Sequence, residues 1–307
     1  MISVKNLTKE FETVVAVQDI SFDIDEGEIF GFLGPNGAGK TTTIRMLSTL
    51  ISPTSGSITI DDKDPKTGGE HIRSIIGLLT ESPGLYEKIS AYDNLDYFSS
   101  FYDMPDKQRK ANIEKYLKMF GLWQRKDDLA GTYSKGMKQK LALTRALIHE
   151  PRILFLDEPT AGLDPESAHM VRSFIESLKK EKITIFLCTH NLTEASNLSG
   201  RICFIKKKII KIASLGELQN HDKHRKVEIV FRDDATRFLP VLKNIKNILE
   251  VDTNKNKAIL LVSEPEKSNP GIIRELTSNN IDILYLNEIK ASLEEIYLDL
   301  IKDEETK

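Results

Sequence analysis

The sequence predicts an α/β protein with a parallel-sheet core and a small C-terminal α+β domain. Short, fully apolar runs such as residues 153–156 are typical of buried parallel strands, and they alternate with segments of helical spacing. A glycine-rich stretch, residues 34–42, follows one of these runs and precedes a helical segment. Beyond Ala213 the composition becomes polar and a weaker strand and helix pattern begins, which indicates a separate second domain.

The overall composition indicates a soluble globular protein. The 307 residues are enough for two domains, and 40% hydrophobic and 29% charged residues are ordinary values. A net charge of −3 produces no field that would favour nucleic acid. Cys188 and Cys203 lie in apolar runs without metal-ligand spacing, which predicts buried, reduced thiols. We expect neither a signal peptide nor a membrane helix, so any step at a membrane requires a partner that spans it.

The glycine-rich stretch fits the pattern G-x-x-x-x-G-K-[ST] of the phosphate-binding loop in P-loop NTPases. Residues 28–33 before it predict a buried strand, and residues 42–50 after it have helical spacing. Glycines let successive N–H groups face one anion, and the following helix adds its positive N-terminal end. The alternative is a turn that binds nothing, which the flanking strand and helix disfavour. The residues expected to bind nucleotide are Asn36, Gly37, Ala38, Gly39, Lys40, Thr41 and Thr42.

Two acidic residues end the apolar run at 153–156, and they suit a phosphoryl-transfer site. In an open parallel sheet, ligands bind at the carboxyl ends of the strands, which is where Asp157 and Glu158 stand. We expect Thr41 and Asp157 to hold Mg²⁺ and Lys40 to reach the terminal phosphates. Glu158 would orient and deprotonate the attacking water. A solvated acidic turn is the alternative, and the phosphate-binding loop in the same chain disfavours it.

His190 follows another buried run, residues 183–188, and therefore stands at the same edge of the predicted sheet. A histidine at a strand end is more often a surface residue than a catalytic one. Because the neighbouring strands carry the phosphate loop and the acidic pair, we expect His190 to contact the γ-phosphate.

The remaining segments of the first domain predict an antiparallel patch and an inserted helical subdomain. Residues 2–7, 14–17 and 21–24 predict strands that pair beside the main sheet. Residues 90–122 have helical spacing interrupted near Pro105, and helix resumes after Ser134, a plausible N-cap. The inserted subdomain is therefore expected at about residues 82–150.

The predicted domain boundaries place the core at residues 1–213, a linker at 214–226 and the second domain at 227–307. In the second domain, strands are expected at residues 227–231, 248–251, 258–262 and 281–286, and helices at 235–246, 270–278 and 292–301. The lysine-rich residues 205–211 predict a solvated strand at a sheet edge, where lysines block unwanted pairing. A lipid-facing patch is the alternative interpretation.

Together these motifs resemble the ATP-binding subunit of ABC transporters, and the match covers residues 2 to about 213. The resemblance implies that Phe11 stacks on adenine and that the cofactors are ATP and Mg²⁺. It also implies that residues 161–164 form the D-loop, which crosses the interface of a dimer. The resemblance is to an ATP hydrolase, so it implies the roles expected above for Lys40 and Glu158.

Two segments depart from the pattern of this family. Residues 133–137 stand where the family has its LSGGQ signature; Ser134 and Gly136 match it, while Lys135 replaces a glycine and Tyr133 and Met137 also differ. Glu81 stands where the family has the Q-loop glutamine, which touches magnesium. Because a carboxylate oxygen also suits Mg²⁺, we expect Glu81 to keep the metal contact.

The resemblance further implies an assembly and a location. Two chains would pack head to tail as a homodimer, so that Ser134 and Gly136 of one face the γ-phosphate held by the other. A separate membrane permease would convert the ATP cycle into export, with this subunit cytoplasmic and peripheral on the inner face of the membrane. Residues 291–297 resemble the extension of ATPases that serve drug, bacteriocin or sodium exporters.

Two other functions are compatible with the phosphate-binding loop. A soluble ABC ATPase acting on ribosomes or DNA usually carries two motif sets or long coiled-coil insertions, and this sequence has neither. A small-molecule kinase would not need the signature-like segment 133–137 or the D-loop-like segment 161–164. The sequence therefore favours the transporter subunit, and it does not specify the transported substrate, the permease or the role of the C-terminal domain.

Overall fold

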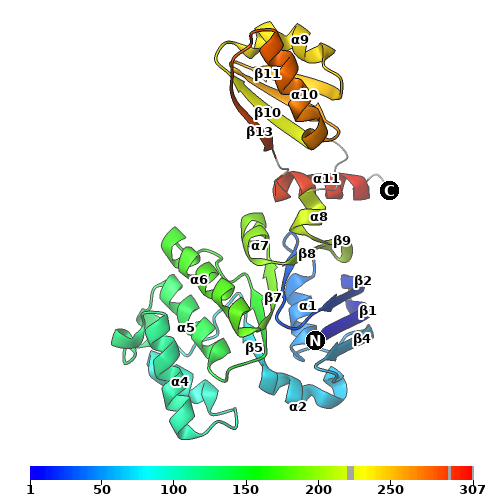
Figure 1. The fold of residues 1–307 in the computed structure, drawn as a ribbon. Coiled ribbons are helices and arrows are strands. Elements are labelled where there is room, and N and C mark those ends of the chain that lie inside the picture. The colour runs from blue at the N-terminus through cyan, green and yellow to red at the C-terminus, as the bar shows by residue number, and fades with distance from the viewer. Residues whose placement is uncertain (220–224, 290–291, 306–307) are drawn as a thin grey trace. The chain divides into compact units, whose positions relative to one another are not determined.

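The computed structural model describes residues 1–219, 225–289 and 292–305, and it confirms the predicted mixed α/β fold (Figure 1). The chain divides into two compact units, Met1–Ser214 and Leu215–Lys307, and each unit has its own hydrophobic core. No helix in the described ranges is both long and apolar enough to cross a bilayer.

The central sheet of the first unit has the strand order β5-β6-β7-β3-β8-β9, parallel throughout except for β9. Its strands are β3 (Ile29–Leu33), β5 (Ile76–Leu79), β6 (Ile153–Asp157), β7 (Thr184–Thr189), β8 (Arg201–Lys206) and β9 (Lys208–Ser214). Every residue of β3, β6 and β7 is buried, as expected for strands covered on both faces. Leu33 of β3 pairs with Thr189, and Asp157 pairs with Cys188, so the carboxyl ends of these strands lie level with one another.

Two hydrophobic clusters cover the two faces of this sheet. Side chains alternate along β6, so that Leu154 and Leu156 join one cluster while Ile153 and Phe155 join the other. The helices of this unit are α1 (Lys40–Leu47), α2 (Pro65–Ile75), α3 (Ala91–Ser99), α4 (Asp106–Met119), α5 (Lys135–Leu147), α6 (Pro165–Leu178) and α7 (Leu192–Leu198). Short 3₁₀ helices occupy Trp123–Arg125, Ala130–Thr132 and Lys179–Glu181.

The inserted helical block consists of α3, α4 and α5, which pack against one another (Figure 1). The break between α3 and α4 falls beside Pro105, and Ser134 caps α5 by accepting a hydrogen bond from the Met137 N–H. These features follow the sequence prediction, because proline and an N-cap serine mark helix starts through local chemistry.

The antiparallel sheet has the order β2-β1-β4, formed by β1 (Ile2–Phe11), β2 (Val14–Ile24) and β4 (Ser55–Ile60). The prediction of two separate strands at residues 14–17 and 21–24 is wrong, because β2 is continuous. Asn6 and Asp19 both adopt positive φ, and their side chains bond to each other at 2.9 Å. The two strands are therefore irregular at the same level, and pairing resumes beyond it.

The lysine-rich segment is also corrected, since residues 205–211 do not form one strand. The chain turns sharply at Lys207, whose φ is 63°, and β8 and β9 form a hairpin around it. The Lys207 N–H donates to the Ala38 carbonyl at 2.9 Å, and its carbonyl accepts from the Gln18 N–H at 2.8 Å. These contacts tie the turn to the phosphate-binding loop, which the composition of the segment could not reveal.

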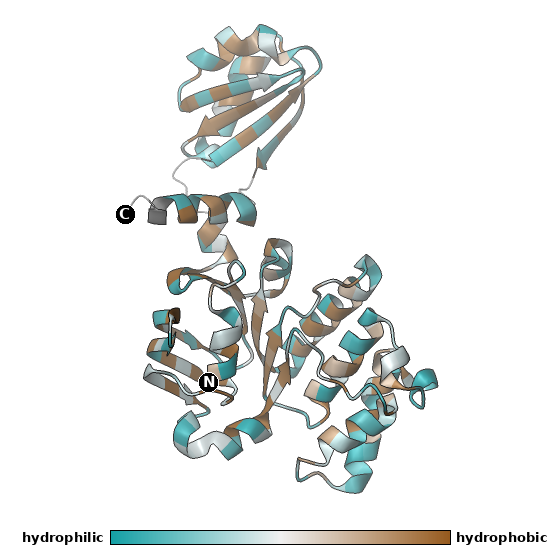
Figure 2. Cartoon of the chain, turned by 180° about the vertical axis from the view of Figure 1, so that it is seen from behind, coloured by the Kyte–Doolittle hydropathy of each residue, from teal (hydrophilic) through white to brown (hydrophobic). Residues whose placement is uncertain are grey.

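The second unit is an antiparallel sheet with the order β11-β12-β10-β13 and a β-α-β-β-α-β chain order. Its elements are α8 (Leu215–Gln219), β10 (Arg225–Phe231), a 3₁₀ turn (Ala235–Phe238), α9 (Leu239–Asn244), β11 (Ile248–Asn254), β12 (Lys257–Val262), α10 (Pro265–Ser278), β13 (Ile283–Ile289) and α11 (Leu293–Glu305). Hydrophobic and hydrophilic residues alternate along its strands, whereas the central strands of the first unit are largely apolar (Figure 2).

Two details of the second unit differ from the prediction. The expected linker at residues 214–226 contains helix α8 and the first residues of β10, while its residues 220–224 lie outside the described part. Helix α10 begins at Pro265 rather than Pro270, because Pro265 occupies the first turn, where its fixed φ suits a helix start. Pro270 therefore lies inside the helix.

Candidate functional site

A cavity of about 460 Å³ lies at the carboxyl ends of β3, β6 and β7. Its lining combines the phosphate-binding loop with the strand ends singled out in the sequence. The lining residues are Val14, Ala16, Pro35, Asn36, Gly37, Gly39, Lys40, Thr41, Thr42, Glu81, Asp157, Glu158, Ala161 and His190. The topology thus brings segments far apart in the sequence to one edge of the sheet.

The loop has the backbone shape of an anion nest. Gly37 and Gly39 adopt φ values of 79° and 102°, and a side chain at Gly39 would also approach the Ala16 carbonyl to 2.6 Å. Among the described residues no side chain caps the start of α1, so its first N–H groups remain available to a ligand. The Lys40 ammonium donates to the carbonyls of Gly34 at 2.7 Å and Pro35 at 3.2 Å. Lys40 is therefore held in the loop as a buried positive charge.

Thr41 and Asp157 meet at the mouth of this loop, where the Thr41 hydroxyl donates to the Asp157 carboxylate at 2.8 Å. Burial raises the pKa of Asp157, while the Thr41 hydrogen bond opposes that rise. The charges of Glu158 and Glu81 raise this pKa further. Three acidic groups thus line one cavity and influence one another, although no three His, Cys, Asp or Glu side chains among the described residues are arranged to hold a metal ion by themselves.

Glu158 lies between Lys40 and His190. One oxygen of its carboxylate is 2.8 Å from His190 Nδ1 and 3.5 Å from Lys40 Nζ. Glu158 also adopts a φ of 51°, a left-handed conformation that typically costs about 1 kcal/mol for a residue other than glycine. Its N–H donates to the Cys188 carbonyl at 2.9 Å, which fixes this strained turn on the neighbouring strand. Backbone strain at an acidic residue beside a lysine and a histidine marks a chemical site.

The structure gathers most of the predicted site residues in the cavity but not all of them. Ala38 is in the loop without lining the cavity. Phe11 ends β1 and is 47% exposed, with the Lys9 ammonium 5.0 Å above its ring. Ser134 and Gly136 lie at the start of α5 and are absent from the lining of this cavity.

Two lining residues, Val14 and Ala16, were missed by the sequence reasoning, whereas Pro35 and Ala161 lie in the predicted phosphate-binding and D-loop-like segments. Val14 and Ala16 are two residues apart on β2, so they project to the same face of that strand. The alternating pattern of the strand indicates that Val14 and Ala16 share a face. That this face lies opposite the phosphate-binding loop depends on the tertiary fold.

Lys135, which stands where the family signature has a glycine, lies against the D-loop-like segment. A Cβ atom added to Gly162 would come within 2.0 Å of Lys135 Nζ and 3.0 Å of its Cε, so the lysine side chain covers this glycine. Gly162 has a φ of 65°, which a residue with a side chain rarely adopts. The space left by the missing side chain is thus filled by Lys135.

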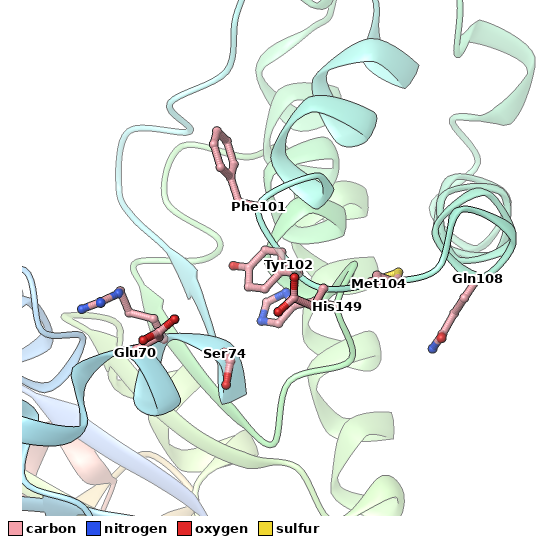
Figure 3. A pocket seen from close by; sticks show the side chains of 9 residues that line it. Glu70, Ser74, Phe101, Tyr102, Met104, Gln108 and His149 are labelled. Carbon is pink, nitrogen blue, oxygen red and sulfur yellow. The ribbon is translucent and has the colours of Figure 1, made fainter.

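A second cavity of about 640 Å³ lies away from the motifs (Figure 3). Glu70 and Ser74 reach it from α2, Tyr102 and Met104 from the segment between α3 and α4, and His149 from the end of α5. The Tyr102 and His149 rings stack with centroids 3.8 Å apart and an interplanar angle of 7°. Burial lowers the pKa of His149 to about 4, despite its hydrogen bond to the Ile76 carbonyl. This larger cavity holds none of the phosphate-binding residues, so volume alone does not identify the functional site.

Comparison with known proteins places the chain among ATP-binding transporter subunits. The ABC transporter family model matches residues 17–161. The chain is 37% identical to the ABC transporter ATP-binding protein NatA of Bacillus subtilis, over 77% of this chain and 99% of that protein. It is 34% identical to the bacitracin transport ATP-binding protein BcrA of Bacillus licheniformis, over 98% of this chain and 97% of that one.

Solved structures give the same result. An ATP-binding subunit of an ABC transporter superimposes with a TM-score of 0.67 at 28% identity, covering 72% of this chain and 92% of that chain. The dimeric ATP-binding cassette MJ0796, in a post-hydrolysis state bound to ADP and Pi, superimposes with a TM-score of 0.65 at 26% identity. That match covers 70% of this chain and 99% of the cassette.

Proposed function

The chain belongs to the ABC transporter family as an ATP-binding and ATP-hydrolysing subunit, and we propose that two copies of it drive export through a separate membrane permease. The relatives described above carry transporter and transport names, and a fluoroquinolones export ATP-binding protein of Mycobacterium tuberculosis is 38% identical to this chain. These names support an export role and give no support to an action on ribosomes or DNA. The substrates named for those relatives are not assigned to this chain. Identifying the permease would identify the substrate.

One observation supports the hydrolytic site most strongly, the convergence of Lys40, Thr41, Asp157, Glu158 and His190 on one cavity. We propose that the loop N–H groups and Lys40 hold the β- and γ-phosphates, because together they form a concentrated positive site. Glu158 takes the proton of the attacking water, since its carboxylate lies beside the loop. His190 contacts the γ-phosphate and positions Glu158, whose carboxylate it approaches to 2.8 Å.

The residues present fit a magnesium ion. The Thr41 hydroxyl and the Asp157 carboxylate lie 2.8 Å apart, and Glu81 lines the same cavity. Mg²⁺ prefers oxygen ligands and usually keeps several waters, so few protein ligands are needed beside the phosphates. We propose that Thr41, Asp157 and Glu81 hold the ion, which neutralises charge on the phosphates when bound.

The signature-like residues support a dimer. Ser134 and Gly136 lie at the start of α5 and outside the cavity of their own chain. A helix start that carries a hydroxyl group suits an anion. The cassette MJ0796, which this chain resembles, is dimeric. We propose a head-to-tail homodimer in which Ser134 and Gly136 of one copy face the γ-phosphate bound by the other. Phe11 would stack on the adenine beside the loop.

An apolar cleft of about 340 Å³ is the proposed contact with the permease. It is lined by Leu50, Leu78, Phe98 and Phe101, among others, and Leu50 and Phe101 are 57% and 69% exposed. An exposed apolar cleft favours a protein partner. We propose that a cytoplasmic segment of the permease docks here and holds the subunit at the inner face of the membrane.

Co-purification tests the assignment. The tagged chain, expressed with the permease encoded beside it and solubilised in detergent, is expected to retain that permease and to hydrolyse ATP. Leu50→Ser with Phe101→Ser should lose the permease while the free subunit still hydrolyses ATP. Met119→Ser is the control, because Met119 is also exposed but lies outside the cleft. Recovery of ribosomes instead of a permease would contradict the proposal.

A further inference from the structure

Glu194 is a buried carboxylate to which the mechanism above gives no role. It lies in α7 and is 1% exposed. The Thr160 hydroxyl donates to one of its oxygens at 2.8 Å, and the Thr189 hydroxyl donates to the other at 2.7 Å. Both carboxylate oxygens are therefore bound by threonines from different segments.

These two threonines flank the catalytic groups. Thr189 ends β7 and directly precedes His190, while Thr160 follows Glu158 by two residues. The carboxylate of Glu194 thus bridges the segment that carries the base and the segment that carries the histidine. Asn191 completes the arrangement, because its N–H donates to the Thr189 hydroxyl at 3.0 Å and its side chain accepts from the Glu194 N–H at 3.0 Å.

The Thr189 hydroxyl has one proton and two carboxylates within reach. It lies 2.7 Å from Glu194 and 3.4 Å from the second oxygen of Glu158. The shorter distance gives the proton to Glu194, which leaves that oxygen of Glu158 without a strong donor. Without Glu194 the hydroxyl could turn to Glu158 and change the hydrogen bonds of that carboxylate.

Burying a carboxylate carries a cost in desolvation free energy, which hydrogen bonds only partly offset. Burial raises the pKa of Glu194, and the charge of Glu158 acts in the same direction, while the Thr189 and Thr160 hydrogen bonds oppose them. An apolar residue of similar size would avoid the desolvation cost, so stability alone does not explain the carboxylate.

We propose that Glu194 is a positioning residue for ATP hydrolysis, because its carboxylate holds Thr160 and Thr189 and thereby fixes Glu158 and His190 relative to each other. The inference rests on the proposed roles of Glu158 and His190. It adds a link between the segment that carries Glu158 and Thr160 and the segment that carries the histidine, formed by the hydrogen bonds of Thr160, Thr189 and Glu194.

Single and paired variants test this role. We expect Glu194→Leu to lower kcat about tenfold with KM for ATP nearly unchanged. Glu194→Gln should recover part of the loss, because its amide can still bond to both hydroxyls. Thr160→Val and Thr189→Val should each lower kcat, and Thr144→Val is the control, since the buried Thr144 hydroxyl bonds only to the Lys140 carbonyl among the described residues.

A structural role predicts different results. If Glu194 only stabilised the fold, Glu194→Leu would lower the unfolding temperature but not the kcat of the folded protein, and that result would overturn the proposal. In a His190→Ala background the effect of Glu194→Leu should shrink to about twofold, because the two residues act through one arrangement. An undiminished effect there would overturn it as well. Absence of hydrolysis by the unaltered chain with its permease would instead overturn the proposed function together with this inference.

Discussion

Buried charges are distributed unevenly between the two units. In Met1–Ser214, the residues Lys40, Asp157, Glu158 and Glu194 are all at most 9% exposed. In the described part of Leu215–Lys307, Ser268 is the buried polar side chain, and the charged groups are at least partly exposed. Because burying a charge is costly, such groups persist where they take part in chemistry. Both units have a packed core, and the buried charges therefore place the reaction in the first unit.

The backbone shows the same contrast. Several residues of the first unit, such as Thr49 and Lys182, also have positive φ in connections, but Glu158 has a positive φ inside the site, directly after a buried strand. In the second unit the positive φ values of Asn247, Lys255 and Asn280 fall in connections between elements. Strain that only shapes a turn is common for asparagine, whereas strain at a buried glutamate needs support from its surroundings. The first unit supplies that support through the Cys188 carbonyl, which accepts from the Glu158 N–H, and through the Ala161 N–H, which donates to the Glu158 carbonyl.

The largest effect expected in the first unit comes from Glu158→Gln. Glutamine keeps the size of the side chain but cannot take a proton, so turnover should fall roughly 100-fold or more while ATP still binds. An ATP-bound dimer should then accumulate, as measured by light scattering during gel filtration. Glu114→Gln is the control, because Glu114 pairs with Lys118 on the exposed face of α4. Hydrolysis by Glu158→Gln at a rate near that of the unaltered chain would contradict the assignment of the base.

His149 is a buried titratable group of the first unit that lies outside the nucleotide site. It tests whether such a group changes the free energy of unfolding. Its pKa is about 4 in the folded chain against 6.5 ordinarily, so the unfolded chain binds its proton first as the pH falls. The free energy of unfolding should therefore decrease between pH 6.5 and 4, by about 3 kcal/mol in total. Above pH 6.5 the contribution is fully present.

His149→Phe removes this pH dependence, because phenylalanine keeps the ring against Tyr102 but cannot bind a proton. Urea unfolding of both proteins from pH 7 to pH 4 gives the difference between them, in which the shared carboxylates cancel. A difference that does not change with pH would show that His149 is solvated.

Glu81 is expected to have a smaller effect, because it lines the nucleotide cavity but is exposed. Glu81→Ala should raise the Mg²⁺ concentration needed for half-maximal hydrolysis about tenfold, and it should lose stimulation by the permease. Glu81→Gln should stay active with a smaller rise, since a neutral oxygen replaces a charged one. Superimposable Mg²⁺ titrations of the three proteins would exclude Glu81 from the site.

Local chemistry accounts for what the sequence predicted well. The phosphate loop, the acidic pair and His190 each follow an apolar run, and the rule that ligands bind at the carboxyl ends of parallel strands brings them together. The start of α5 at Ser134 and the break near Pro105 likewise depend on a few neighbouring residues. Such features are readable because their cause lies within a short segment.

Other features depend on residues far apart in the chain, and the sequence did not reveal them. The continuity of β2 depends on Asn6 matching Asp19, and the turn at Lys207 depends on bonds to Ala38 and Gln18. The role of Glu194 likewise requires Thr160 and Thr189 to fold against it. None of these contacts has a local sequence signal, so only the structure shows them.

The smallest effect is expected from removing the second unit. A chain ending at Ser214 keeps every residue that lines the nucleotide cavity, and its two hydrophobic clusters remain whole. NatA supports this design, because 77% of this chain covers 99% of that relative. We therefore propose that the shortened chain folds and binds ATP within about twofold of the full chain, as expected for independent units.

Calorimetric titration with ATP, alongside permease-stimulated hydrolysis, separates the two units. Unchanged binding with altered stimulation would assign the second unit to dimerisation or to control by the permease. A folded, shortened chain that no longer binds ATP would show instead that the second unit contributes to the nucleotide site. The contrast in buried charge would then fail as a guide to where function lies.

A matched chain that keeps residues 1–219, and so includes α8, tests whether any change arises from the cut itself. Equal binding by both shortened chains would place the determinants of ATP affinity within the first unit.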